Sequence, residues 1–227
     1  EINYRDWSSD VCSSDLVVHP RVLSDDPPVA TFRDDEIWRV SPMHNTEKLE
    51  KILLVIRDEI LPLTESEVAR GNHVFGGAIM RADTLTSVMV GSNNRVENPL
   101  FHGEIDTLNR FFKLPLHPPT KDLLFIATHD PCAMCAASIA WAGFKELWVL
   151  FDYKDVEETF GMPVDLLMYR ELFDTEGVRP ENAFFTKHSL KKAVVTNPDR
   201  EKLEPLLDEI EKRYTALEVQ EFEYPGM

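Results

Sequence analysis

Two short motifs limit what this chain can fold into more than any other feature of its sequence. The first is His102-Gly103-Glu104, and the second is Pro131-Cys132-Ala133-Met134-Cys135. Together they offer one imidazole, two thiols and one further carboxylate. A catalytic zinc centre needs three protein ligands, an open position for water and a base beside it. The pattern therefore predicts a Zn²⁺ site with His102, Cys132 and Cys135 as ligands and Glu104 as the catalytic acid and base.

The local chemistry of the second motif agrees with this prediction. Cys132 and Cys135 are three residues apart, which places them on one face of a helical turn. Pro131 suits the start of a helix, and the N-terminus of a helix favours negative charge. We therefore expect both sulfurs to be held as thiolates.

The cysteine pair has two other interpretations. One is a redox pair, and the other is half of a structural zinc knuckle with four ligands. A redox pair leaves His102 and Glu104 unexplained. The remaining cysteine, Cys12, lies in a segment that we exclude from the fold, so a fourth ligand is missing. The catalytic zinc reading is the one we favour.

Charge and cysteine content restrict the partners and the compartment. The chain has 227 residues, a net charge of −16 and scattered Lys and Arg residues. Proteins that bind along a phosphate backbone usually show basic stripes, so the charge disfavours nucleic acid as a partner. No apolar run approaches the length of a membrane span, and no basic and then apolar secretory signal opens the chain. Three cysteines, two of them in the motif, suit a reducing cytoplasmic location.

The chain divides into four segments. Residues 6–16 resemble the in-frame translation of a sequencing adapter, so we expect 1–16 to be a non-native leader and the natural sequence to begin near Val17. The alternative is a genuine Ser/Asp-rich tail. Residues 17–45 are expected to form an N-terminal arm and 46–175 the zinc domain. Residues 176–227 are expected to form a C-terminal helical extension packed on the same domain.

Hydrophobic periodicity predicts the secondary structure. Thr46–Leu61 is predicted as a helix that Pro62 stops. Further helices are predicted at 101–112, 132–141, 164–173 and 200–217, and strands at 74–80, 87–90, 123–128, 147–151 and 192–195. Alternating strands and helices imply an α/β fold with a three-layer α/β/α sheet and extra C-terminal helices. Both motifs then lie at helix N-termini beyond strand ends, where such sheets bind ligands.

The motif pair and the element order resemble those of the cytidine deaminase superfamily, in its nucleobase and nucleoside deaminase branch. The resemblance covers roughly residues 72–173. It implies a zinc-dependent replacement of an exocyclic amine by oxygen, with Glu104 as the proton shuttle. The backbone N–H of Cys132 would help to hold the zinc-bound hydroxide. Asn93 or Asn94 falls near the asparagine that contacts the substrate ring, and Gly77 near the pocket floor.

Two finer resemblances point to different substrates. The run from Leu100 to Leu108, with Gly103 between His and Glu, is similar to fungal cytosine deaminase. The stretches Ala140–Ala142 and Asp165–Leu172 look like bacterial guanine deaminase, which implies that Asp165 takes part in substrate handling. His129-Asp130-Pro131-Cys132 departs from the commoner Glu-Pro-Cys. These differences concern the substrate and leave the reaction type unchanged.

Three more polar residues are candidates for substrate contact. Asp106 lies one helical turn after His102 and would orient its ring or meet the substrate; a solvated carboxylate is about equally plausible. His129 adjoins the cysteine turn, although a structural histidine is the commoner case. Asp152 follows a strand on the predicted ligand side.

We therefore expect a cytoplasmic zinc aminohydrolase, active on a free nucleobase or nucleoside of the cytosine or guanine type and assembled as a homodimer. One alternative is a tRNA adenosine deaminase. The other is a non-catalytic zinc-binding paralogue, which the presence of Glu104 disfavours.

Overall fold

The computed structural model describes residues 42–217, and it contains helices on both sides of one sheet. The predicted leader and residues 17–41 of the arm lie outside the described residues. The first half contains α1 (Pro42–Val55), a π-helical turn (Ile56–Ile60), α2 (Leu61–Val68), β1 (Gly76–Arg81), β2 (Ser87–Ser92) and α3 (Gly103–Phe112). The second half contains a 3₁₀ turn (Thr120–Asp122), β3 (Leu123–His129), α4 (Ala133–Ala142), β4 (Glu146–Phe151), α5 (Tyr153–Glu158), α6 (Val164–Phe173), β5 (Thr186–Ser189), α7 (Leu190–Val195) and α8 (Arg200–Thr215).

The five strands form one mixed sheet in the order β2-β1-β3-β4-β5. β1 pairs antiparallel with both β2 and β3, whereas β3, β4 and β5 run parallel to one another. All seven residues of β3 are buried, as expected for a central strand covered on both faces. The carboxyl ends of β3 and β4 therefore lie next to each other.

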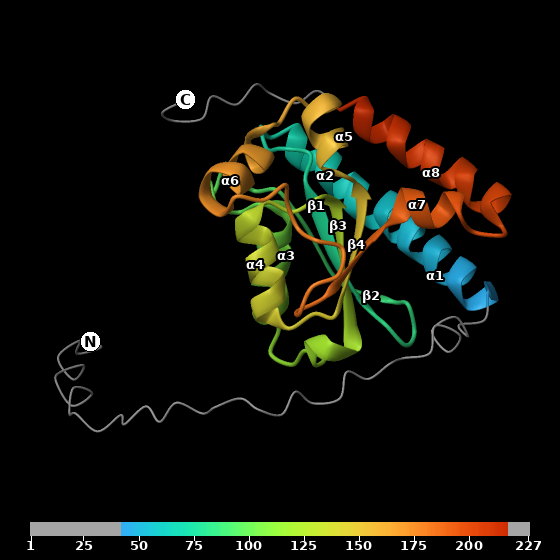
Figure 1. Ribbon diagram of the computed structural model, residues 1–227. Coiled ribbons are helices and arrows are strands. Elements are labelled where there is room, and N and C mark those ends of the chain that lie inside the picture. Colours follow the sequence, from blue (N-terminus) through green and yellow to red (C-terminus); the bar gives the residue numbers. More distant parts are fainter. Residues whose placement is uncertain (1–41, 218–227) are drawn as a thin grey trace, which may run out of the picture. The chain divides into compact units, whose positions relative to one another are not determined.

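Helices cover both faces of the sheet, which confirms the predicted three-layer arrangement (Figure 1). On one face, α3 and α4 pack through Leu108, Phe111 and Ile139 against Phe125 and Ala127 of β3. A second hydrophobic cluster on the other face combines β3 with α1, α2, α7 and α8. Its members include Leu53, Leu61, Leu124, Ile126, Leu190, Val194, Leu203, Leu207 and Tyr214. The alternation along β3 reflects the two-residue period of a strand.

The first helical segment is longer than predicted, because Pro62 does not end it. The π-helical turn precedes α2, where the N–H of Leu61 bonds to the carbonyl of Ile56. Pro62 occupies the second position of α2. Because Ile60 and Leu61 are both helical, Pro62 lies within a continuous helical segment, and the π-helical turn directly before it is where the change in hydrogen-bond spacing occurs. The segment begins earlier as well, since α1 starts at Pro42, within the predicted arm.

The strand predicted at 192–195 is wrong, because these residues belong to α7. The valines suggested a strand, but Leu190 and Val194 are four residues apart and both are buried, which is a helical spacing. The side chain of Ser189 caps the helix by accepting a hydrogen bond from the N–H of Lys192 at 3.3 Å. The strand in this region is β5, which precedes the helix.

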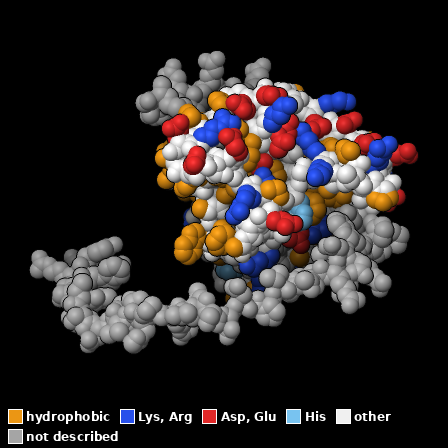
Figure 2. Space-filling model, viewed as in Figure 1, with side chains coloured by type: hydrophobic (Ala, Val, Ile, Leu, Met, Phe, Trp, Pro, Cys, Tyr) orange, Lys and Arg blue, Asp and Glu red, His pale blue; other side chains and the backbone are white. Residues whose placement is uncertain are grey.

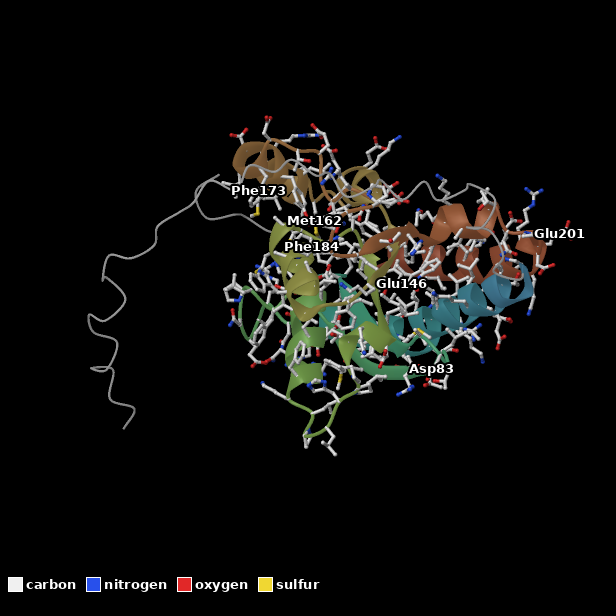
Figure 3. All side chains as sticks on the ribbon, turned by 60° about the horizontal axis from the view of Figure 1, so that its bottom comes forward. Asp83, Glu146, Met162, Phe173, Phe184 and Glu201 are labelled. Atoms are coloured by element: carbon white, nitrogen blue, oxygen red, sulfur yellow. The ribbon has the colours of Figure 1, made fainter. Side chains whose placement is uncertain are left out.

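Ion pairs and hydrogen bonds link α1 to β4 and link α5, α7 and α8 to one another. At the start of β4, the carboxylate of Glu146 accepts hydrogen bonds from Lys48 of α1 at 2.5 Å and from the indole N–H of Trp148 at 3.0 Å (Figure 3 labels Glu146). Lys191 of α7 contacts both Asp155 of α5 and Glu211 of α8.

None of the helices within residues 42–217 combines the length and the apolar character that crossing a bilayer requires.

Candidate metal centre

The two predicted motifs meet at the N-termini of two neighbouring helices. His102 is the N-cap residue of α3 and Cys132 is the N-cap residue of α4, both with extended backbone geometry. Cys135 lies in the first turn of α4 and is completely buried. Because α4 follows directly from β3, its first residues are fixed to the carboxyl end of a central strand. This is the position that the sequence predicted for the site.

His102, Cys132 and Cys135 form a compact group of metal-ligating side chains. Their ligand atoms all lie within 4.8 Å of one another. The distance from the Sγ atom of Cys132 to the Nδ1 atom of His102 is 3.5 Å. Sulfur and nitrogen ligands that share one tetrahedral zinc ion lie about 3.6 Å apart. Two thiols and one imidazole at these separations fit Zn²⁺, and the cluster is a typical zinc site of cytidine-deaminase-like enzymes.

The charges of the three side chains are coupled. Hydrogen bonds from Cys135 and His102 lower the pKa of the Cys132 thiol to about 4, although burial opposes this shift. Burial would lower the pKa of His102, but the hydrogen bond and negative charge of Cys132 raise it above its usual value. Burial raises the pKa of Cys135. These contacts favour the thiolate form of Cys132.

Glu104 lies beside the cluster without belonging to the ligand group. Its side chain is 4% exposed. Burial, and next the negative charge of Cys132, raise the pKa of Glu104 to about 7. A carboxyl group with a pKa near the working pH can both accept and donate a proton during a reaction. The role of Glu104 as a proton shuttle stays a prediction.

The two candidate asparagines occupy different environments at the end of β2. Asn93 is 1% exposed, and its Oδ1 atom accepts hydrogen bonds from the N–H groups of His73 and Arg95. This arrangement fixes the side chain from its oxygen. Asn94 instead donates from Nδ2 to Glu97 at 2.6 Å, within the following exposed turn. Asn93 is therefore fixed through its oxygen, whereas Asn94 is tied to the turn through its amide nitrogen.

Two glycines of the motif region have a packing explanation. A Cβ atom on Gly103 would lie 2.5 Å from the backbone oxygen of Phe75, so only glycine allows α3 to approach β1 this closely. A Cβ atom on Gly77 would lie 2.9 Å from the Oγ1 atom of Thr107 on α3. Both glycines serve contact between α3 and the sheet. Gly103 therefore has a packing role that does not depend on the substrate.

Three other predicted residues have structural partners that account for them. Asp106 is buried and forms an ion pair with Arg110 at 2.6 Å. Asp152 is exposed and caps α5, where it accepts a hydrogen bond from the N–H of Asp155. The structure does not bring His129 into the ligand group either.

The ring of His129 is enclosed by aromatic side chains. It stacks on Phe151 with ring centroids 4.8 Å apart and meets the edges of Phe75, Phe160 and Tyr214. Its Nδ1 atom lies 2.9 Å from the hydroxyl of Thr128. This environment is that of a packed core residue.

Asp165 lies in the first turn of α6 and is 8% exposed. Burial raises the pKa of Asp165, and the negative charges of Cys132 and Glu104 add to the effect while His102 opposes it. These interactions place its carboxyl group close to the metal cluster.

Sequence reasoning missed the side chains that surround the ligands. Phe75 lies parallel to His102, and it packs with Val156 and Met162 in a small hydrophobic cluster. Tyr153 and Tyr169 both donate hydrogen bonds to the carbonyl oxygen of Pro131. Single aromatic residues outside a motif resemble ordinary core residues, so no sequence signal separated them.

A groove of about 650 Å³ lies away from this cluster, along the edge strand β2. It is lined by residues of α1, the π-helical turn and 85–90, and it includes none of the predicted site residues. Figure 2 draws one face of the molecule, on which acidic and basic side chains are interspersed.

A His-Cys-Cys zinc centre with a buried glutamate, on a mixed five-stranded sheet with helices on both faces, defines a zinc-dependent deaminase with a cytidine-deaminase-like fold. The chain belongs to the MafB19-like deaminase family, whose sequence model matches residues 56–193, more than half of the chain.

Relatives with curated names share part of this region. A tRNA-specific adenosine deaminase of Rickettsia felis is 35% identical over 80 residues, which are 34% of this chain and 56% of that protein. A second, of Rickettsia bellii, is 29% identical over 92 residues, 40% of this chain and 63% of that protein. The matched region thus spans about three fifths of their length. A guanine deaminase structure from Nitrosomonas europaea has 23% identity and a TM-score of 0.44, covering 69% of this chain and 81% of that one.

Proposed function

We propose that this protein hydrolytically deaminates a nucleobase, with adenosine in RNA as the first substrate class to test. The observation that carries the reaction is the position of buried Glu104 next to the ligand group of His102, Cys132 and Cys135. The substrate class is supported by the two sequence relatives, which are named tRNA-specific adenosine deaminases. The reaction consumes water, replaces the exocyclic amine by oxygen and releases ammonia.

Each side chain has a defined part in this proposal. His102, Cys132 and Cys135 would hold Zn²⁺, which supplies a water made acidic enough to act as a nucleophile near neutral pH. Glu104 would take one proton of the attacking water and give it to a ring nitrogen, and would later take the second proton of that water and give it to the departing amine, which leaves as ammonia. Asn93, held from its Oδ1 atom, presents its amide to the ring.

A free purine base is the second candidate, and two observations favour it. The net charge of −16 opposes binding to a polyanion. Asp165 adds a buried carboxyl group beside the cluster, where it can meet the polar edge of a purine. The predicted homodimer and the roles of the substrate contacts remain predictions.

The test is ammonia release from a substrate panel by purified, zinc-loaded protein. The panel contains tRNA, short RNA hairpins, adenosine, adenine, guanine and cytosine, with the Glu104→Gln variant as the blank. Inosine formed in RNA supports the first substrate class, and ammonia from guanine alone supports the second. Metal analysis that finds no zinc, together with no turnover after zinc is added, would refute the proposal.

A further inference from the structure

Two tyrosines donate hydrogen bonds to the carbonyl oxygen of the peptide group between Pro131 and Cys132. The hydroxyl of Tyr153 donates to the Pro131 oxygen at 2.8 Å, and the hydroxyl of Tyr169 donates to the same atom at 3.2 Å. Tyr153 begins α5 and Tyr169 lies in α6, so two separate helices converge on one carbonyl. A carbonyl oxygen has two lone pairs, and here both are used.

The other side of this peptide group carries the N–H of Cys132. The peptide is trans, since the described residues contain no cis peptide bond. In a planar trans peptide, the N–H points opposite to the C=O. Cys132 is the N-cap residue of α4, so its N–H has no partner within the helix. Holding the oxygen therefore also sets the direction of the one N–H that adjoins the metal ligand.

A buried ion pair fixes the residue before this peptide. The Nζ atom of Lys187 in β5 lies 2.7 Å from a carboxylate oxygen of Asp130, and both side chains are largely shielded from water. The same ammonium group lies 5.0 Å from the ring centroid of Tyr153. The N–H of Asp130 also bonds to the carbonyl of Phe151 in β4 at 2.8 Å. The loop is thus held by four elements that follow it in the chain: β4, α5, α6 and β5.

The geometry points to Tyr153 and Tyr169, assisted by the Asp130–Lys187 pair, as positioning residues that aim the Cys132 N–H and its thiolate at the metal centre. This inference rests on the proposed function. A fixed N–H acts on negative charge that develops on oxygen in the transition state. Loss of the two hydroxyls is therefore expected to lower kcat with little change in KM, and to loosen the metal. Mutation of residues that orient metal ligands commonly lowers metal affinity about 10- to 100-fold.

The experiment compares Tyr153→Phe, Tyr169→Phe and the double variant with wild type, all loaded with zinc. The rate of zinc transfer to an excess of a chromophoric chelator is measured at pH 7.5. We expect a release rate about 10- to 100-fold higher in the double variant, and smaller changes in the single variants because one hydroxyl still donates. Cobalt-loaded protein should show shifted thiolate-to-cobalt absorption bands in the double variant only.

Tyr214→Phe is the matched control, because it also removes a buried tyrosine hydroxyl, but one that lies on α8 and is not among the two that donate to the Pro131 oxygen. Urea unfolding of each variant separates lost stability from a looser metal site. The inference is overturned if the double variant releases zinc no faster than Tyr214→Phe, or if kcat is unchanged.

One further double variant tests the Asp130–Lys187 ion pair without leaving an unpaired buried charge. The combined change Asp130→Asn and Lys187→Gln keeps size and polarity while it removes both charges, and it should also raise the zinc release rate. An unchanged rate excludes the pair from the positioning role. A wild-type protein that binds no zinc would instead contradict the proposed function itself. Failure of the positioning role and failure of the proposed function are therefore distinguishable.

Discussion

The ring of Phe75 lies parallel to the ring of His102, with ring centroids 6.5 Å apart and an interplanar angle of 12°. The backbone oxygen of Phe75 accepts a hydrogen bond from the N–H of Asn93 at 2.7 Å. A single residue just before β1 therefore packs beside a zinc ligand and fixes the residue that carries the candidate substrate amide. The site depends on this residue as well as on the two motifs.

The first prediction concerns the proton shuttle. Glu104→Gln should retain one zinc per chain, because Glu104 lies outside the ligand group. Turnover should fall about 10²- to 10⁴-fold or more, since an amide cannot carry the proton. Steady-state ammonia release and metal analysis on the same sample check this. Glu158→Gln, on the exposed end of α5, is the control and should behave as wild type.

The second prediction concerns metal removal. A chelator that strips zinc should abolish turnover and lower the midpoint of thermal unfolding, because zinc binds only the folded arrangement of these ligands. At a free zinc concentration 1,000 times Kd, the stabilisation is about 4 kcal/mol. Differential scanning fluorimetry with and without chelator measures it. Unfolding midpoints that coincide, with the metal verified as removed, would argue against a zinc site at His102, Cys132 and Cys135.

The third prediction separates packing from specificity at Gly103. Gly103→Ala should destabilise the fold by about 1–3 kcal/mol, because the added methyl group meets the backbone of Phe75. The order of preference among substrates should not change. Urea unfolding and the substrate panel test both parts. Gly161→Ala is a useful comparison, since its Cβ would enter open space and only the positive φ of 66° opposes it.

The fourth prediction concerns pH. Burial, with a smaller effect of Lys191, lowers the pKa of His129 from 6.5 to about 3. Between these values only the unfolded chain takes up the proton, so the stability is fully present above pH 6.5 and decreases as the pH falls toward 3. This one residue should cost about 2 kcal/mol between pH 7 and pH 5.

His129→Phe keeps an aromatic ring among Phe75, Phe151, Phe160 and Tyr214 but removes the titrating group. Its free energy of unfolding should therefore decline less steeply from pH 7 to pH 5 than that of wild type. Burial also lowers the pKa of His73, to about 4, so a residual slope is expected in the variant. Parallel slopes for the two proteins would contradict the assignment.

The metal ligands were predictable from the sequence because they belong to short motifs with characteristic spacings. Cys132 and Cys135 share one turn, and His102 precedes Glu104 by two residues, so local geometry was enough. The layers of the fold followed from periodicity for the same reason. The packing role of Gly103 was not predictable, because the backbone of Phe75 that excludes a side chain is visible only in three dimensions.

Long-range partners were not predictable from one sequence. Asp130 and Lys187 meet because β5 lies next to β4 in a parallel arrangement, and the sequence showed no strand at 186–189. The same holds for Tyr153 and Tyr169, whose hydroxyls meet at Pro131 only after α5 and α6 fold over the loop. Asp152 was placed correctly at a strand end, but its capping bond to Asp155 gives it a local role.

The contact between Lys187 and Asp130 also has a consequence for the newly made chain. During translation, His102, Cys132 and Cys135 leave the ribosome before Lys187 has been polymerised. The ligands of the metal are thus all present while the loop that carries Cys132 still lacks its last support. A nascent chain at that stage can meet zinc, but the finished surroundings of the site arise only once β5 has been synthesised and has paired with β4.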